Sequence, residues 1–300
     1  MMSDQAQGLR ALVHASAATT AGTLEQTAPL ARVIAVTSGK GGVGKTTLTC
    51  NLGIAMARAG ARVVVLDADL GLANVHVLLG ISPPCNLEGL LAGGATLAQV
   101  LLPTDYGIRV VAGASGVTQY SEMDAPRRER LRMALADLDA QADIVLVDTA
   151  AGLAPNVRAF ICAAPEVIVV TTPDPTAIAD AYATIKVASR ENPTARVMLL
   201  PNMVGSEREA LQVGERLRAV SRRFLSHEIE FLGHVPTDAA VGRAVRAQRP
   251  FAVASPSAPA VRAVEAVVQR LGWAAPPRAG GLTELIGRMS ARVTGGRGAV

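Results

Sequence analysis

The sequence predicts an α/β fold, a single doubly wound and mostly parallel sheet with helices on both faces. Short apolar runs rich in β-branched residues alternate with helical patterns from Val33 to Leu271, without a long break. A glycine-rich stretch follows the first of these runs and opens a helix. Half of the 300 residues are hydrophobic and only 3% are aromatic, so the core must be built from Ala, Val, Leu and Ile.

The stretch from Val33 to Thr47 reads VIAVTSGKGGVGKTT. Its first four residues predict a buried parallel strand, and residues 45–59 predict the helix that follows. Between them, residues 39–46 match the phosphate-binding pattern G-x-x-x-x-G-K-[ST]. Glycines let backbone N–H groups approach phosphate oxygens, and the positive end of the helix favours the same anion. Lys45 can reach the β- and γ-phosphates, and the Thr46 hydroxyl can bind Mg²⁺.

Lys40 is a second lysine inside this loop. In the form GKGGVGKTT it resembles the deviant Walker A motif of the MinD/ParA family of SIMIBI-type P-loop ATPases. The resemblance implies ATP and Mg²⁺ as cofactors and a homodimer in which Lys40 reaches the partner's nucleotide. Lys40 and Lys45 are therefore expected to be catalytic. The nucleotide-binding loop is expected to comprise Gly39, Lys40, Gly41, Gly42, Val43, Gly44, Lys45, Thr46 and Thr47.

Two carboxylates follow the second predicted strand, Arg62 to Asp67. Asp67 and Asp69 stand at the carboxyl end of a parallel strand, where doubly wound sheets place ligands, although a pair of turn-forming aspartates is the alternative. The run DADLGLANVHVLLG resembles the switch I region of the FlhG (FleN, YlxH) branch of MinD-like ATPases. That match implies that Asp69 positions the attacking water and that Asp67 supports the metal.

The central apolar strand, Asp143 to Asp148, also ends in a carboxylate. This is the Walker B arrangement, in which Asp148 can hold the Mg²⁺ shell opposite Thr46. The predicted metal-binding residues are therefore Thr46, Asp67 and Asp148. The following TAAG, residues 149–152, resembles the switch II turn of the same family.

The rest of the chain continues the alternation, with short surface helices expected between Cys85 and Leu102. Further strands are expected at Ile108–Ala112, Glu166–Thr172, Arg196–Asn202 and Glu230–Val235, and helices at Asp124–Ala140, Ser206–Phe224 and Ala258–Leu271. A guanine-specific site would show N/T-K-x-D after the strand that Asn202 ends, and the chain does not. The resemblance implies that Asn202 reads adenine and that the loop with Pro236 and Asp238 closes over the base. ATP is therefore favoured over GTP.

The two ends suggest interaction elements outside the ATPase domain, which is assigned to residues 32–273. Residues 1–31 are interpreted as a short helix and linker, with a frayed terminus as the alternative. The sequence of residues 4–10 resembles the DQAxxLR element of the FlhG branch, which contacts and stimulates the signal-recognition-type GTPase FlhF. The residues that carry this match are Asp4, Gln5, Ala6, Leu9 and Arg10.

Residues 274–300 are interpreted as a hinge and an amphipathic helix. The apolar positions at helical spacing are Leu282, Leu285, Ile286, Met289 and Val293. One interpretation is a last helix that docks on its own domain. The other, implied by the resemblance, is an interfacial membrane helix. Five partly buried side chains would gain roughly 5 kcal/mol and each arginine about 1 kcal/mol more, whereas ordering a short free helix costs several kcal/mol in return. Membrane binding by one tail is therefore marginal, and two tails on a dimer would gain about 10²–10⁴ in avidity.

Composition bounds the location and partners of the chain. It has no secretory signal and no run of 18 apolar residues, and its three cysteines are scattered, which favours a cytoplasmic protein. The net charge of +4 permits contact with an anionic membrane surface without demanding nucleic acid, so DNA is not expected as a partner. The resemblance implies a slow ATPase switch that controls flagellar number or placement, peripheral on the membrane in the ATP state, and in contact with a flagellar transcription regulator or switch-complex protein.

Two other classes stay open. One is a ParA-type segregation ATPase that binds DNA through arginines in the stretches 127–132 and 216–223. The other is a reductase of the nitrogenase-iron-protein type, which uses the same loop but needs two cysteines per subunit to ligate a cluster. The resemblance supports no such placement for Cys85 or Cys162.

Overall fold

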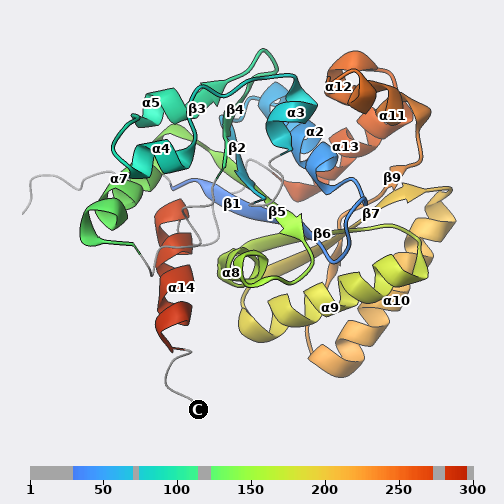
Figure 1. The fold of residues 1–300 in the computed structure, drawn as a ribbon. Helices are drawn as coiled ribbons and strands as arrows, with labels where there is room; N and C mark the ends of the chain where they lie inside the picture. Colours follow the sequence, from blue (N-terminus) through green and yellow to red (C-terminus); the bar gives the residue numbers. More distant parts are fainter. Residues whose placement is uncertain (1–29, 70–73, 114–122, 273–280, 296–300) are drawn as a thin grey trace, which may run out of the picture.

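The alternation of strands and helices forms a single layered α/β domain in the computed structural model, which describes residues 30–69, 74–113, 123–272 and 281–295, with side chains as far as Met289 (Figure 1). Within these residues the sheet has nine strands, in the order β3-β4-β2-β5-β1-β6-β7-β8, with β9 paired to β7. Every pair is parallel except β3 with β4. The predicted doubly wound, mostly parallel sheet is confirmed.

The elements follow the predicted order, and most predicted strands and helices are present. The strands are β1 (Arg32–Ser38), β2 (Val63–Ala68), β3 (Leu101–Pro103), β4 (Ile108–Val111), β5 (Ile144–Ala151), β6 (Glu166–Thr171), β7 (Arg196–Val204), β8 (Glu230–Phe231) and β9 (Val235–Pro236). The helices are α2 (Lys45–Arg58), α3 (Val75–Leu79), α4 (Leu87–Leu91), α5 (Leu97–Val100), α7 (Ala125–Gln141), α8 (Pro155–Ala163), α9 (Pro175–Glu191), α10 (Glu207–Leu225), α11 (Ala239–Arg246), α12 (Phe251–Ala254), α13 (Pro259–Leu271) and α14 (Leu282–Gly295).

The central strand β1 shows why the strand sequences are continuously apolar. Val33 and Ala35 join the core on one face of the sheet, whereas Ile34 and Val36 join the core on the other. Helices α7, α8, α9, α10 and α14 cover the first face, and α2, α3, α11, α12 and α13 cover the second (Figure 1). Because helices cover both faces of the sheet, the strand side chains that point to one face and those that point to the other must all be apolar.

The structure differs from the expected elements at two places. The segment expected to be one strand, Glu230–Val235, is divided into β8 and β9, because Gly233 adopts a φ of 132° between them. The segment after Cys85 contains the expected short helices but ends in β3, an antiparallel edge strand. Edge strands this short carry little periodicity, so the sequence pattern does not reveal them.

The last helix, α14, docks on its own domain. Leu282, Leu285, Ile286 and Met289 are at most 5% exposed and belong to the core that contains α7 and α8. In this conformation these four side chains are unavailable to a membrane, which agrees with the docking interpretation. Val293 lies in the helix, but its side chain is outside the described part. Among the helices in the described ranges, none is long and apolar enough to cross a bilayer.

Candidate functional site

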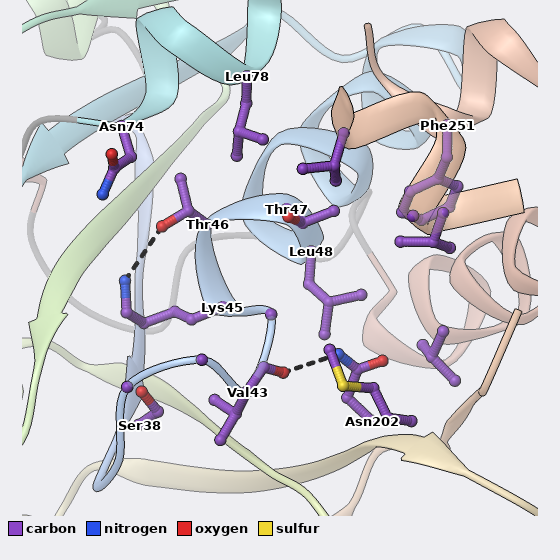
Figure 2. Close-up of a pocket in the computed structure, with 18 of the residues that line it drawn as sticks. Ser38, Val43, Lys45, Thr46, Thr47, Leu48, Asn74, Leu78, Asn202 and Phe251 are labelled. Atoms are coloured by element: carbon purple, nitrogen blue, oxygen red, sulfur yellow. Dashed lines mark hydrogen bonds between the residues drawn. The ribbon is translucent and has the colours of Figure 1, made fainter. Parts of the chain in front are cut away.

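The predicted phosphate loop forms one wall of a cavity of about 860 Å³ at the carboxyl ends of the strands (Figure 2). Residues 40–47 all line this cavity, and the helix α2 begins at Lys45. Gly44 has a φ of 85°, and a Cβ there would meet the Asn202 amide nitrogen at 2.5 Å. Gly39 is not among the residues that line the cavity, and a Cβ there would meet the backbone of Asp180 in α9 at 2.3 Å. The glycines at both positions are therefore required by close approach of neighbouring chain segments.

Lys45 is held by a buried ion pair. Its Nζ lies 3.0 Å from Oδ1 of Asp148 and 3.3 Å from the Thr46 hydroxyl, the second of which Figure 2 shows. Asp148 is fully buried in β5, and Thr49 Oγ1 lies 3.0 Å from the same Oδ1. Burial raises the pKa of the Asp148 carboxyl, while Lys45 and the hydroxyls of Thr46 and Thr49 act in the opposite direction. The predicted Walker A lysine and Walker B aspartate thus meet directly.

Asp67 lies beside Asp148, because the two residues are paired in register across β2 and β5. Its carboxylate is 1% exposed and accepts hydrogen bonds from the backbone N–H groups of Asp69 and Val75, at 3.2 and 3.1 Å. Burial, followed by repulsion from Asp148, raises the pKa of Asp67 to about 6. Both oxygens of Asp67 therefore accept hydrogen bonds from the backbone, one from Asp69 and one from Val75.

The donors fit a Mg²⁺ ion held mainly by nucleotide and water. Mg²⁺ characteristically keeps several waters and takes one or two carboxylates together with substrate phosphates. Asp148 Oδ2 is buried and without a hydrogen-bond partner among the described residues, and Thr46 presents a hydroxyl on the cavity wall. The described residues contain no group of three or more His, Cys, Asp or Glu side chains that could hold a metal ion by itself. The Asp148 oxygen and the Thr46 hydroxyl could complete the shell of a nucleotide-bound Mg²⁺.

The two remaining predicted catalytic residues lie at the cavity margin. Lys40 is exposed, and its Nζ donates to the Thr176 hydroxyl at the start of α9, 2.9 Å away. Asp69 lines the cavity and is half-buried. The four residues after Asp69 lie outside the described residues, so most of switch I is not described.

The opposite end of the cavity is apolar and holds the residues predicted to contact the base. Asn202, Pro236 and Asp238 all line it. Asn202 donates its amide to the Val43 carbonyl at 2.7 Å, which leaves its side-chain oxygen as an acceptor (Figure 2). The apolar residues at this end include Met203, Val241, Val245 and Phe251. Such a surface suits the faces of a purine.

Asp238 has a structural task in addition to its place on the wall. Its Oδ1 accepts the Ala240 N–H at 2.8 Å and caps α11, and its Oδ2 accepts the Ala260 N–H of α13 at 3.2 Å. Because both oxygens are used, Asp238 shapes the base end by holding two helices. Its predicted contact with the nucleotide stays a prediction.

Sequence reasoning missed two polar residues on α2. Thr49 holds Asp148, and its position four residues after Lys45 is a helical spacing that could have revealed it. Asn51 is buried, donates to the Thr47 carbonyl at 2.7 Å and accepts the Ala252 N–H at 2.9 Å. It ties α12 to the phosphate-loop helix across a separation of 201 residues, which no local pattern predicts.

Two further predictions concern the N-terminal segment and the cysteines. The partner-binding residues Asp4, Gln5, Ala6, Leu9 and Arg10 lie outside the described residues. Cys162 is buried in α8, and its thiol lies 3.0 Å from a carboxylate oxygen of Glu191. A buried thiol cannot ligate a cluster at a surface, which argues against the reductase alternative.

Comparisons with known proteins agree with this geometry. The family model of the CobQ/CobB/MinD/ParA nucleotide binding domain matches residues 34–251. The chain is 42% identical over 246 residues to the antiactivator FleN of Pseudomonas aeruginosa, covering 82% of this chain and 88% of FleN. It is 34% identical over 219 residues to the flagellum site-determining protein YlxH of Helicobacter pylori, covering 73% of this chain and 74% of YlxH.

Solved structures show the same fold. The cell division ATPase MinD of Pyrococcus furiosus aligns with a TM-score of 0.66 at 24% identity, over 82% of this chain and 100% of that one. A MinC:MinD complex of Aquifex aeolicus aligns with a TM-score of 0.64 at 25% identity, over 80% of this chain and 96% of that one. With its phosphate loop in the expected context, the chain belongs to the MinD/ParA family of nucleotide-binding ATPases, in the FlhG-type branch.

Proposed function

We propose that this chain is an ATP-driven switch that dimerises on ATP, attaches to the membrane and regulates flagellar number or placement. The flagellar role is supported by the names of its relatives, an antiactivator and a flagellum site-determining protein. The observation that carries the switch is the buried pair of Lys45 and Asp148 on the wall of the nucleotide cavity. Phosphate groups compete for Lys45, so nucleotide binding frees one carboxylate at the metal site.

The proposed chemistry assigns a task to each residue of the site. Backbone N–H groups of the loop, Lys45 and Thr46 bind the phosphates and their Mg²⁺, which neutralises charge on the triphosphate. Asp148 and Asp67 hold the hydration shell of the ion. Asp69 orients the water that attacks the γ-phosphate in line. Adenine occupies the apolar end beside Asn202.

Dimerisation is supported by the placement of Lys40. Its Nζ donates an exposed hydrogen bond to the Thr176 hydroxyl, which contributes only about 1 kcal/mol net. Releasing the Lys40 side chain from Thr176 therefore costs little free energy. We propose that Lys40 leaves Thr176 and binds the nucleotide of the second subunit across the dimer.

Membrane attachment through α14 requires this helix to undock from α7 and α8. Burial of four apolar side chains stabilises the docked helix by roughly 6–12 kcal/mol before the cost of ordering it. Insertion of the same apolar side chains into a bilayer interface recovers part of this burial free energy, and a dimer inserts two helices at once. We therefore propose that ATP-dependent dimerisation favours the undocked helix, so that attachment reports the bound nucleotide. The N-terminal segment is proposed to contact and stimulate an FlhF-type GTPase.

Liposome co-sedimentation tests the proposal. The full chain and a chain ending at Gly281 are each mixed with anionic vesicles in ATP and in ADP. We expect only the full chain to pellet, mainly with ATP. Equal pelleting of the full chain in both nucleotides would contradict a nucleotide-gated anchor. Removal of residues 1–31 is expected to leave pelleting unchanged and to abolish stimulation of GTP hydrolysis by the FlhF-type partner.

The DNA-binding alternative receives less support. Within the arginine run of α7, Arg130 donates to the Leu91 carbonyl and Arg132 pairs with Glu129. Two of the four arginines are therefore already engaged within the chain. DNA binding with a steep salt dependence in the ATP state would reverse this preference.

A further inference from the structure

Thr49 is a buried polar residue that the phosphate-loop motif does not include. It lies one helical turn after Lys45 on α2 and is 0% exposed. Its Oγ1 is 3.0 Å from Asp148 Oδ1 and 3.0 Å from the Lys45 carbonyl oxygen. We infer that Thr49 is a positioning residue whose hydroxyl fixes the Asp148 carboxylate, so that Oδ2 stays available to the Mg²⁺ shell after Lys45 has moved to the nucleotide.

The chemistry of the hydroxyl decides which contact matters. Thr49 has one O–H proton and two acceptors within reach. A hydrogen bond to an ionised carboxylate is roughly twice as strong as one to a neutral carbonyl. The proton therefore goes to Asp148, and Thr49 joins the phosphate-loop helix to the carboxylate in β5.

This bond gains importance when nucleotide binds. Without nucleotide, Asp148 Oδ1 has two partners, Lys45 and Thr49, whereas Oδ2 has none among the residues that the structure describes. Once Lys45 turns to the phosphates and the Thr46 hydroxyl turns to Mg²⁺, Thr49 is the partner that remains on Asp148 Oδ1. A buried carboxylate that loses its partners is costly and can rotate about its χ angles. Thr49 therefore preserves the orientation of Asp148 across both states.

The inference rests on the proposed role of Asp148 in the Mg²⁺ shell, and the experiment separates the two. Thr49→Val removes the hydroxyl at nearly constant volume, Thr49→Ser keeps it, and Thr49→Ala serves if valine perturbs folding. Thr184→Val is the matched control, because Thr184 is also 0% exposed and its Oγ1 lies 3.0 Å from the carbonyl of Asp180, four residues earlier. That contact involves no carboxylate.

Calorimetric titration of the full chain with ADP, in EDTA and at graded free Mg²⁺, gives the Mg²⁺ concentration at which nucleotide binding is half-maximally strengthened. We expect Thr49→Val and Thr49→Ala to raise this midpoint by about tenfold or more, the effect of losing a hydrogen bond to a charged group, with affinity in EDTA unchanged. Thr49→Ser and Thr184→Val should keep the wild-type midpoint.

Two results would overturn the inference. One is a wild-type midpoint in Thr49→Val and Thr49→Ala. The other is an equal loss of affinity with and without Mg²⁺, which a merely structural role would produce. A wild-type protein whose ADP affinity does not respond to Mg²⁺ at all would instead refute the proposed role of Asp148.

Discussion

The carboxylate of Asp139 holds the first residues of α14 against the domain. Replacing Asp139 by alanine should therefore weaken the docking of this helix. Asp139 is buried on α7, and its Oδ1 accepts the Leu282 N–H at 2.8 Å. Its Oδ2 accepts both the backbone N–H and the hydroxyl of Thr283, each at 3.2 Å. A Cβ on Gly281 would meet Asp139 Oδ1 at 2.2 Å, so the chain passes directly over the carboxylate. Asp139 is therefore an N-cap for α14 supplied by another helix.

The expected effect of Asp139→Ala follows from these contacts. Loss of an N-cap costs about 0.5–2 kcal/mol, and the buried Leu282 N–H would lose its partner as well. A cost of about 2 kcal/mol corresponds to a roughly thirtyfold increase in the undocked population. Because the four buried apolar side chains contribute roughly 6–12 kcal/mol, the helix should remain mostly docked.

Hydrogen exchange over residues 282–289, measured on the nucleotide-free chain by mass spectrometry, reads this equilibrium directly. We expect hydrogen exchange in these residues to be roughly thirtyfold faster in Asp139→Ala, with the exchange rates of other segments unchanged. Asp137→Ala is the matched control, since Asp137 is exposed on the same helix and its loss changes the net charge equally. Equal protection of α14 in the two variants would refute the capping argument.

Three further predictions concern the nucleotide site. Because burial raises the pKa of Asp67 to about 6, the folded state binds its proton more tightly than the unfolded state. The free energy of unfolding should therefore fall by about 2 kcal/mol as the pH rises from 4 to 6 through this group, and urea titrations of Asp67→Asn should lack that part of the fall. Gly44→Ala forces a side chain into a φ of 85° beside Asn202, so calorimetry should show ATP affinity reduced by at least about tenfold, and wild-type affinity would contradict the geometry. Lys40→Ala should keep ATP affinity in the monomer and abolish the dimer in light scattering; a dimer in this variant would count against contact in trans.

The sequence predicted the parts of the site that depend on local geometry. A buried strand, a glycine turn and a helix start fix the phosphate loop within fifteen residues, so Lys45 and Thr46 could be placed from the motif. Asp148 could be placed as well, because parallel strands present their carboxyl ends at one edge of the sheet. The meeting of Lys45 with Asp148 follows from those two placements.

Other features depend on packing between distant segments and could not be predicted. The use of both Asp238 oxygens as helix caps depends on where α11 and α13 begin. For α14, an apolar stripe fits a domain core and a membrane interface equally well, because burial of apolar area is non-directional. Only the fit against α7 and α8, with Asp139 at its end, selects the docked arrangement.

The molar mass in solution tests the central claim, that bound ATP drives dimerisation, most directly. Light scattering of the Asp69→Ala variant, which should bind ATP without hydrolysing it, gives that mass in saturating Mg²⁺ with ATP or with ADP. The account predicts twice the chain mass of 30.9 kDa with ATP and the single-chain value with ADP. A single-chain mass in both nucleotides would contradict the switch.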